Sequence, residues 1–372
     1  MSFRAFTCCL IVVFSVLNSW ELGAEERRTL DEPVRRAIGR GLSFLKAKGQ
    51  AADGSFSRSA GPGVTALVTT AILKHGVSAD DPTVQRALKW LEGFQREDGG
   101  IHREGTFYRN YETCLAILCF VEANADGRYD ELLAKADAFV KGLQWDEDHG
   151  KSESDYAFGG QGYGKHKRAD LSNTSFFVEA LTATGNDEDC EAIQKALVFI
   201  SRCQNLESQH NTTPFPAKNP DGGMIYTPDV GGYSQAGKTA NGGLRSYGSM
   251  TYAGLKSMIF AGLGPEDKRV KAAVEWIRAH YDLEMNPGMG KAGLYYYYHT
   301  FAKALDALGQ ESVSDLDGET HDWRSELSQE LVTKQQQDGS WINEGNERWM
   351  EGDPNLVTGY ALLALAYCRP KE

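Results

Sequence analysis

A scattered set of tyrosines, with one histidine and one asparagine, carries groups that can bind an acidic substrate and move a proton. Its members are Asn173, Tyr247, Tyr252, Tyr297 and His299. An amide or an imidazole can neutralise a carboxylate, and a tyrosine or a histidine can remove the proton beside it. Brought together in one cleft, these side chains would suit an acidic glycan. The elements that position them decide whether they act together.

A long segment over about residues 205–245 is rich in glycine, proline, asparagine and tyrosine and shows no helical pattern. Loops of this length are typical of binding loops or lids. We expect this insert to lie over the mouth of a cavity, beside the segment 285–290. The tyrosine run that follows would line the rim or upper wall, unless it packs between helices. The candidate ligand-binding residues are Asn173, Tyr252, Tyr295, Tyr296 and Tyr298.

An internal repeat accounts for most of the remaining chain. Each copy joins an apolar helical pattern to a glutamine and, in most copies, to an Asp-Gly or Gly-Gly turn. The copies cover residues 40–56, 86–101, 135–144, 195–204, 271–280 and 331–341. In most copies a second helical run then opens near a threonine, namely Thr65, Thr113, Thr174, Thr251 and Thr358. A repeat of this kind indicates stacked helical hairpins.

The two helices of each pair differ in character. The first, such as residues 83–94, is amphipathic, whereas the second, such as 113–121 or 358–367, is apolar nearly all round. A helix that is apolar on every side must be buried on every side. Closing the pairs into a ring also avoids the exposed flanks of an open stack. The pattern therefore predicts an all-α (α/α)6 toroid with apolar inner helices and amphipathic outer helices.

These residues resemble the QW repeat of squalene and oxidosqualene cyclases, and the related repeat of protein prenyltransferase β-subunits. The resemblance covers nearly all of a single expected domain over residues 25–370. It implies six hairpins around a central cavity. It also implies that the repeat glutamines and one tryptophan are structural, namely Gln95, Gln144, Gln204, Gln336 and Trp341.

The catalytic signatures of that family are missing. The cyclases protonate their substrate with an Asp-x-Asp-Asp motif, and the closest segments here, 146–148 and 187–189, are expected in a loop and before an outer helix. In the prenyltransferase resemblance Asp170 and His299 fall at zinc-ligand positions, but Ser172 stands where the cysteine should be. A hydroxyl is a poor zinc ligand beside a thiolate. We therefore expect no metal and no cofactor.

The family signatures thus leave enzymatic activity open. The candidate catalytic residues are Asp170, His299, Tyr247 and Tyr297.

The net charge and the N-terminal segment indicate which partners to exclude and where the protein is located. A formal net charge of −12 argues against a nucleic-acid-binding surface, which needs a basic face. Residues 1–24 have a positive charge, an apolar run and a small-residue end, as a signal peptide does. That apolar run is too short to span a bilayer. We expect an exported protein, periplasmic or secreted, that does not span the membrane.

Three functions fit these observations. The first is a binding protein whose cavity holds an apolar small molecule, for example an isoprenoid. The second is an enzyme with a divergent site, either terpenoid-processing or similar to a polysaccharide lyase acting on a glycan. The third is an interaction scaffold whose centre is filled by side chains. An open centre would favour the first two functions, and a centre filled by side chains would favour the third.

Overall fold

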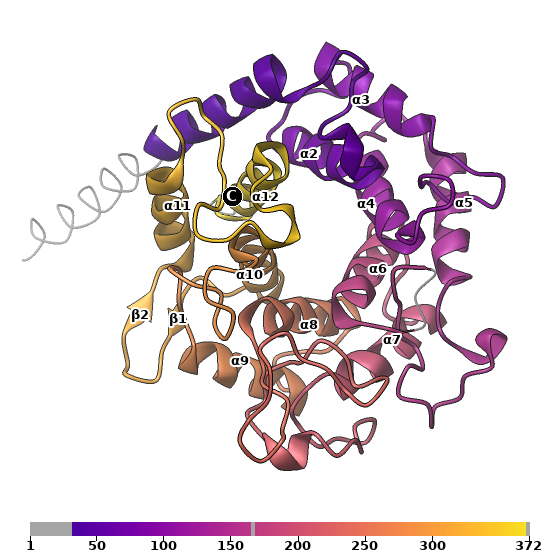
Figure 1. Cartoon of the computed structure of the whole chain (residues 1–372), viewed down its shortest axis with the longest axis vertical. Helices are drawn as coiled ribbons and strands as arrows, with labels where there is room; N and C mark the ends of the chain where they lie inside the picture. The colour runs from indigo at the N-terminus through magenta and orange to yellow at the C-terminus, as the bar shows by residue number, and fades with distance from the viewer. Residues whose placement is uncertain (1–31, 165–167, 370–372) are drawn as a thin grey trace, which may run out of the picture.

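The computed structural model describes residues 32–164 and 168–369. The expected signal peptide, residues 1–24, lies outside this part. In the described part the chain forms two concentric layers of helices, with the inner layer arranged as a ring (Figure 1). The predicted (α/α)6 toroid is thus confirmed.

Inner and outer helices alternate along the chain. The inner helices are α2 (Pro62–Lys74), α4 (Arg109–Glu122), α6 (Leu171–Ala183), α8 (Gly248–Phe260), α10 (Leu294–Leu308) and α12 (Pro354–Tyr367). The outer layer begins with a helix over residues 32–44. It continues with η1 (Leu45–Gly49), α3 (Pro82–Glu92), α5 (Asp130–Lys141), α7 (Glu191–Arg202), α9 (Lys268–Ala279) and α11 (Trp323–Lys334).

The ring closes through the two ends of the repeat. Each inner helix packs against the next one along the chain, and α12 packs against α2. Short elements lie in the connections: η2 (Arg58–Ala60), η3 (Glu147–His149), η4 (Pro216–Lys218), η5 (Arg348–Met350), and the antiparallel pair β1 (Val313–Ser314) and β2 (Thr320–His321).

Local sequence explains why the two layers differ. The outer helix α3 begins at Pro82, behind the capping carboxylate of Asp81, which accepts the Thr83 N–H at 2.9 Å. Its buried positions follow a helical spacing along one face. In the inner helix α12, every residue from 356 to 365 is buried. Burial on all sides requires neighbours on all sides, which the ring supplies.

The repeat glutamines join consecutive outer helices. Each side-chain amide donates to the carbonyl of the turn glycine, and also, at 2.8 Å, to a backbone carbonyl near the start of the next outer helix. The glutamines with this pair of bonds are Gln50, Gln144, Gln204 and Gln335. In the last copy Gln335 thus takes the position expected for Gln336, whose amide bonds Glu344 instead. The structural role predicted from the resemblance is thus present at Gln144 and Gln204, and one residue earlier than expected in the last copy. Gln95 makes no such pair of bonds within the described part of the chain, where its backbone pairs with Ile101.

The repeat threonines hold the turn against the inner helix. Each hydroxyl lies in the first or second turn of its helix and accepts a backbone N–H from the segment after the turn, at 2.9–3.1 Å. These hydroxyls belong to Thr65, Thr113, Thr174, Thr251 and Thr358. An unpaired buried N–H is costly, so a buried hydroxyl at this place is a structural requirement of the hairpin.

Candidate functional site

Two cavities lie at opposite ends of the inner ring. The upper cavity, of about 440 Å³, is bordered by the first turns of the inner helices and by the loops that lead into them. The lower cavity, of about 210 Å³, is bordered by the C-terminal halves of the same helices. Phe176 borders both, and Tyr296 packs next to it with ring centroids 6.3 Å apart. The centre is therefore neither an open channel nor filled throughout, because an aromatic layer separates two hollows.

Aromatic side chains are the largest group that lines the upper cavity. Its tyrosines come from four inner helices or their entry points and from two loops: Tyr108, Tyr111, Tyr163, Tyr226, Tyr247, Tyr296 and Tyr360. The Tyr296 hydroxyl lies 3.1 Å from the hydroxyl of Ser172. Aromatic walls with a few hydroxyl groups favour a largely apolar ligand that carries a small number of polar atoms.

The insert over 205–245 contributes part of this wall. Tyr226 and Gln235 border the upper cavity, and the Gln235 amide oxygen accepts a bond from Arg348 at 2.8 Å. The next two residues, Trp349 and Met350, are exposed, have positive φ and also border the cavity. The insert and the loop before α12 thus meet at the rim, where exposed apolar groups surround the opening.

Two buried carboxylates at the upper end of the ring accept hydrogen bonds from backbone N–H groups. Glu351 accepts the Tyr295 and Tyr296 N–H groups at the start of α10, both at 2.9 Å. Glu112 accepts the Arg103 N–H at 2.8 Å. Burial raises the pKa of both carboxyl groups above the ordinary value, although these bonds oppose the shift. Because backbone donors occupy them, these groups position loops and a helix.

Asp170 lies just behind the tyrosine wall. It caps α6, and its carboxylate accepts the Asn173 N–H at 2.9 Å and the Asn173 amide at 2.9 and 3.0 Å. Burial raises the pKa of Asp170 to about 6, although bonds from Asn173 and Tyr226 oppose the shift. Tyr226 itself borders the cavity. A carboxyl group that can be protonated near neutral pH therefore contacts a side chain that can face a ligand.

The raised pKa of Asp170 makes stability depend on pH. The folded chain keeps this proton up to about pH 6, whereas the ordinary pKa of an aspartate is 3.8. Stability should therefore fall as the pH rises between these values and stay level above them. We expect Asp170→Asn to remove this dependence, so the variant gains about 2–3 kcal/mol relative to the parent between pH 4 and pH 7.

Urea unfolding of both proteins across that pH range checks this expectation, since asparagine also caps helices well. Asp53→Asn is the control, because hydrogen bonds from Ser55 lower the pKa of Asp53. The stability that Asp53 contributes is lost as the pH falls. The Asp53→Asn variant should therefore be less stable than the parent at neutral pH, the opposite of the result expected for Asp170→Asn. If the stability of the parent and that of Asp170→Asn varied with pH in the same way, the raised pKa of Asp170 would be contradicted.

The structure separates the side chains that the sequence grouped. Tyr247 and Tyr296 border the upper cavity, and Asn173 holds Asp170 behind it. His299 borders the lower cavity instead. The remaining tyrosines are buried between helices and border neither cavity: Tyr252, Tyr295, Tyr297 and Tyr298. Tyr297 and Tyr298 donate to the Asp282 and Leu283 carbonyls at 2.7 and 2.5 Å.

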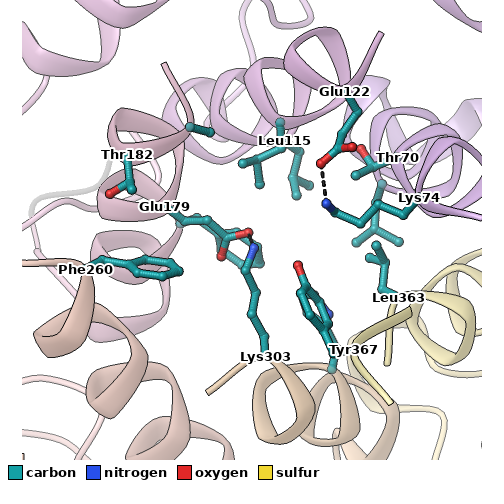
Figure 2. Close-up of a pocket in the computed structure, with 15 residues that line it drawn as sticks. Thr70, Lys74, Leu115, Glu122, Glu179, Thr182, Phe260, Lys303, Leu363 and Tyr367 are labelled. Atoms are coloured by element: carbon teal, nitrogen blue, oxygen red, sulfur yellow. Dashed lines mark hydrogen bonds and ion pairs between the residues drawn. The ribbon is translucent and has the colours of Figure 1, made fainter. Parts of the chain in front are cut away.

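A charged cluster at the lower cavity was not anticipated from the sequence. Glu179 forms ion pairs with both Lys256 and Lys303, and across the cavity Lys74 pairs with Glu122 (Figure 2). Burial raises the pKa of Glu179, but the two ammonium groups outweigh it and hold the pKa well below its usual range. The available signal was a charge in the third turn of each of three largely apolar inner helices, α6, α8 and α10.

Residues that could hold a metal lie away from both cavities. Among the described residues one group of three qualifies, Asp315, Glu319 and His321, beside the short β1–β2 pair. His321 there already contacts Glu326 at 3.1 Å. The residues at the zinc positions of the prenyltransferase resemblance have different surroundings: Asp170 bonds Asn173 at the upper end, and His299 borders the lower cavity.

Comparisons with known proteins agree with this architecture. Residues 59–220 match the family described as the squalene-hopene cyclase C-terminal domain. The type II terpene cyclase MstE from Scytonema is similar in structure, with a TM-score of 0.52 at 12% identity over 90% of this chain and 98% of that chain. A glycosyl hydrolase family 88 protein from Bacteroides vulgatus has a TM-score of 0.52 at 13% identity, over 90% and 98%.

A protein from Actinoplanes is similar to the same degree, with a TM-score of 0.51 at 13% identity over 90% of this chain and 99% of that chain. No curated protein sequence matches the chain. The chain therefore has the α/α-toroid fold of these structures, and residues 59–220 are similar to the squalene-hopene cyclase C-terminal domain. At these identities the likeness to solved structures establishes the fold and leaves the chemistry to the site. None of the described helices is long and apolar enough to cross a membrane.

Proposed function

We propose that this chain is an exported binding protein that holds an apolar, isoprenoid-type small molecule in its upper cavity. The observation that carries the proposal is the tyrosine-lined hollow of about 440 Å³ at the N-terminal ends of the inner helices. Its size is within the range of small-molecule sites, and aromatic side chains are the largest group in its walls. A rim with exposed Trp349 and Met350 suits the entry of an apolar molecule.

Binding can be tested with geranylgeraniol, a neutral isoprenoid alcohol, by following quenching of the intrinsic fluorescence. Ala60 borders the upper cavity near its surface, so Ala60→Trp should fill part of the hollow. We expect this variant to weaken binding by about tenfold, which is the loss of about 1.4 kcal/mol of binding free energy. Ala51→Trp is the matched control, because Ala51 is exposed and borders neither cavity.

Mass spectrometry of an organic extract of the purified protein supplies an independent measurement. Recovery of a stoichiometric apolar molecule, absent from the Ala60→Trp extract, is the expected result. Equal binding by the parent and Ala60→Trp would remove the upper cavity from consideration. Export is tested separately by N-terminal sequencing of the protein outside the cytoplasm, which should begin at Glu25 if residues 1–24 are cleaved.

A catalytic function is the second candidate, favoured by the contact between Asp170 and Tyr226. The Asp170 carboxyl group could pass a proton through the Tyr226 hydroxyl to a molecule in the cavity. A binding protein returns geranylgeraniol unchanged, whereas an enzyme of this kind converts it. Conversion that disappears in both Asp170→Asn and Tyr226→Phe would establish the enzyme, and complete recovery of the alcohol would favour binding alone.

A further inference from the structure

The ion-pair cluster at the lower cavity has one positive charge more than its carboxylates can balance. Among the described residues, the ammonium groups of Lys74, Lys256 and Lys303 pair with two carboxylates, those of Glu122 and Glu179. Lys256 pairs with Glu179 but does not itself border the cavity. Glu179 is shared by two lysines, and the side chains of Glu179 and Lys256 are 4% and 3% exposed. An uncompensated charge is costly in such a place because little water reaches it. A bound anion would remove that cost.

The polar groups around the excess charge converge on one hollow. Figure 2 shows Lys303, Glu179 and the Tyr367 hydroxyl directed into the lower cavity, with the Lys74–Glu122 pair at its edge. His299 also borders the cavity and is 4% exposed. Its Nδ1 has no hydrogen-bond partner in the described part of the chain. Native proteins seldom leave a buried polar atom unpaired, so this nitrogen also fits a ligand.

The rest of the lining limits the kind of anion. Apolar side chains form much of the wall: Leu67, Leu115, Leu118, Phe176, Phe260 and Leu363. A cavity of about 210 Å³ with such walls suits a small molecule that carries both an anionic head and an apolar part. One unbalanced positive charge matches a singly charged head, as a carboxylate is at neutral pH.

We propose that the lower cavity is a second ligand site, separate from the upper one, which binds a small aliphatic carboxylate with its head near Lys303 and His299 and its chain against the leucine and phenylalanine wall. This site does not depend on the function proposed for the upper cavity, because the aromatic layer around Phe176 lies between them. The carboxylate completes the charge balance that the protein alone lacks.

Calorimetry with hexanoate tests the site, with hexanol as the neutral probe of equal chain length and inorganic phosphate as a second anion. We expect hexanoate to bind at least about tenfold more tightly than hexanol. Lys303→Met leaves the carboxylates and ammonium groups balanced, so it should abolish this difference. Glu122→Gln adds a second uncompensated charge at the edge and should strengthen hexanoate binding about fivefold, an increase that damage to the fold would not produce.

Two controls locate the binding. Lys141→Met removes a lysine that pairs with Asp137 at 2.7 Å and borders neither cavity, and it should bind hexanoate as the parent does. Ala60→Trp, which fills part of the upper cavity, should also leave hexanoate binding unchanged. Bound hexanoate should shift the NMR signals of the His299 ring.

Three results would overturn the proposal. Equal binding of hexanoate and hexanol would show that the cavity binds the apolar chain and does not recognise the carboxylate. Tighter binding of phosphate than of hexanoate would exclude the carboxylate assignment. Absence of hexanoate binding in both the parent and Glu122→Gln would mean that the protein balances its own charge, for instance through a neutral Lys256, whose pKa burial lowers.

Discussion

Gly159→Ala should destabilise the chain by at least about 4 kcal/mol and leave little folded protein. Gly159 has a φ of +78°, which a residue with a side chain adopts only with strain. Its added Cβ would also lie 1.8 Å from the Lys195 carbonyl oxygen in α7. Neither backbone can move freely, because the Gly159 carbonyl accepts the Gln144 amide that also bonds Ala192 of that helix.

Gly185→Ala is the matched control for this prediction. Gly185 follows the end of α6 with a φ of +91°, but nothing lies within 4 Å of an added Cβ. It should therefore lose only about 1 kcal/mol, the cost of the left-handed conformation. Urea unfolding of the two variants measures the difference. Similar losses at both positions would mean that the close approach of the turn to the next outer helix contributes nothing to stability.

Glu179→Gln should cost about 3–5 kcal/mol of unfolding free energy, the second largest effect we expect. The variant leaves Lys256 and Lys303 buried without their shared carboxylate. Lys256→Met is the informative comparison, since it leaves one carboxylate facing one ammonium group. Because Glu179 keeps Lys303 as its partner, no buried charge is left unpaired, so this variant should stay within about 1 kcal/mol of the parent.

Urea unfolding at low ionic strength gives both values, and Lys141→Met serves as a lysine control outside the cluster. The order of the two effects is the critical point. If Lys256→Met were as damaging as Glu179→Gln, the cluster would act through packing and not through its charge. A larger loss for Glu179→Gln than for Lys256→Met would also support the charge count at the lower cavity, because it would show that Glu179 offsets two positive charges.

The repeat shows how much of the fold can be predicted from local sequence patterns. Apolar spacing, the glutamine and the turn signal together predicted both layers of the ring, because each of them acts within a hairpin or between neighbours. The one shift, from Gln336 to Gln335, follows from the turn: Gln335 lies four residues before Gly339, as Gln50 lies four before Gly54. In these two copies, spacing counted from the glycine identifies the side chain that makes the bonds.

The candidate site was less accessible from the sequence. Tyr295 and Tyr298 have the composition of a binding wall, but they pack between helices, and of that run Tyr296 alone reaches the upper cavity. Neighbouring residues of a helix point about 100° apart, so a run of four tyrosines cannot share one face. Other tyrosines of the wall, such as Tyr111 and Tyr226, come from segments far apart in the chain.

The sequence by itself determined the helices, their pairing and the closed ring, because amphipathic and apolar periods, caps and turns are properties of short segments. The tertiary structure alone decided that the axis holds two hollows separated by an aromatic layer around Phe176 and Tyr296. It also brought Glu179 together with Lys256 and Lys303 from three helices. Which side chains meet at the centre depends on the rotation of every inner helix, and packing of all six fixes that rotation together.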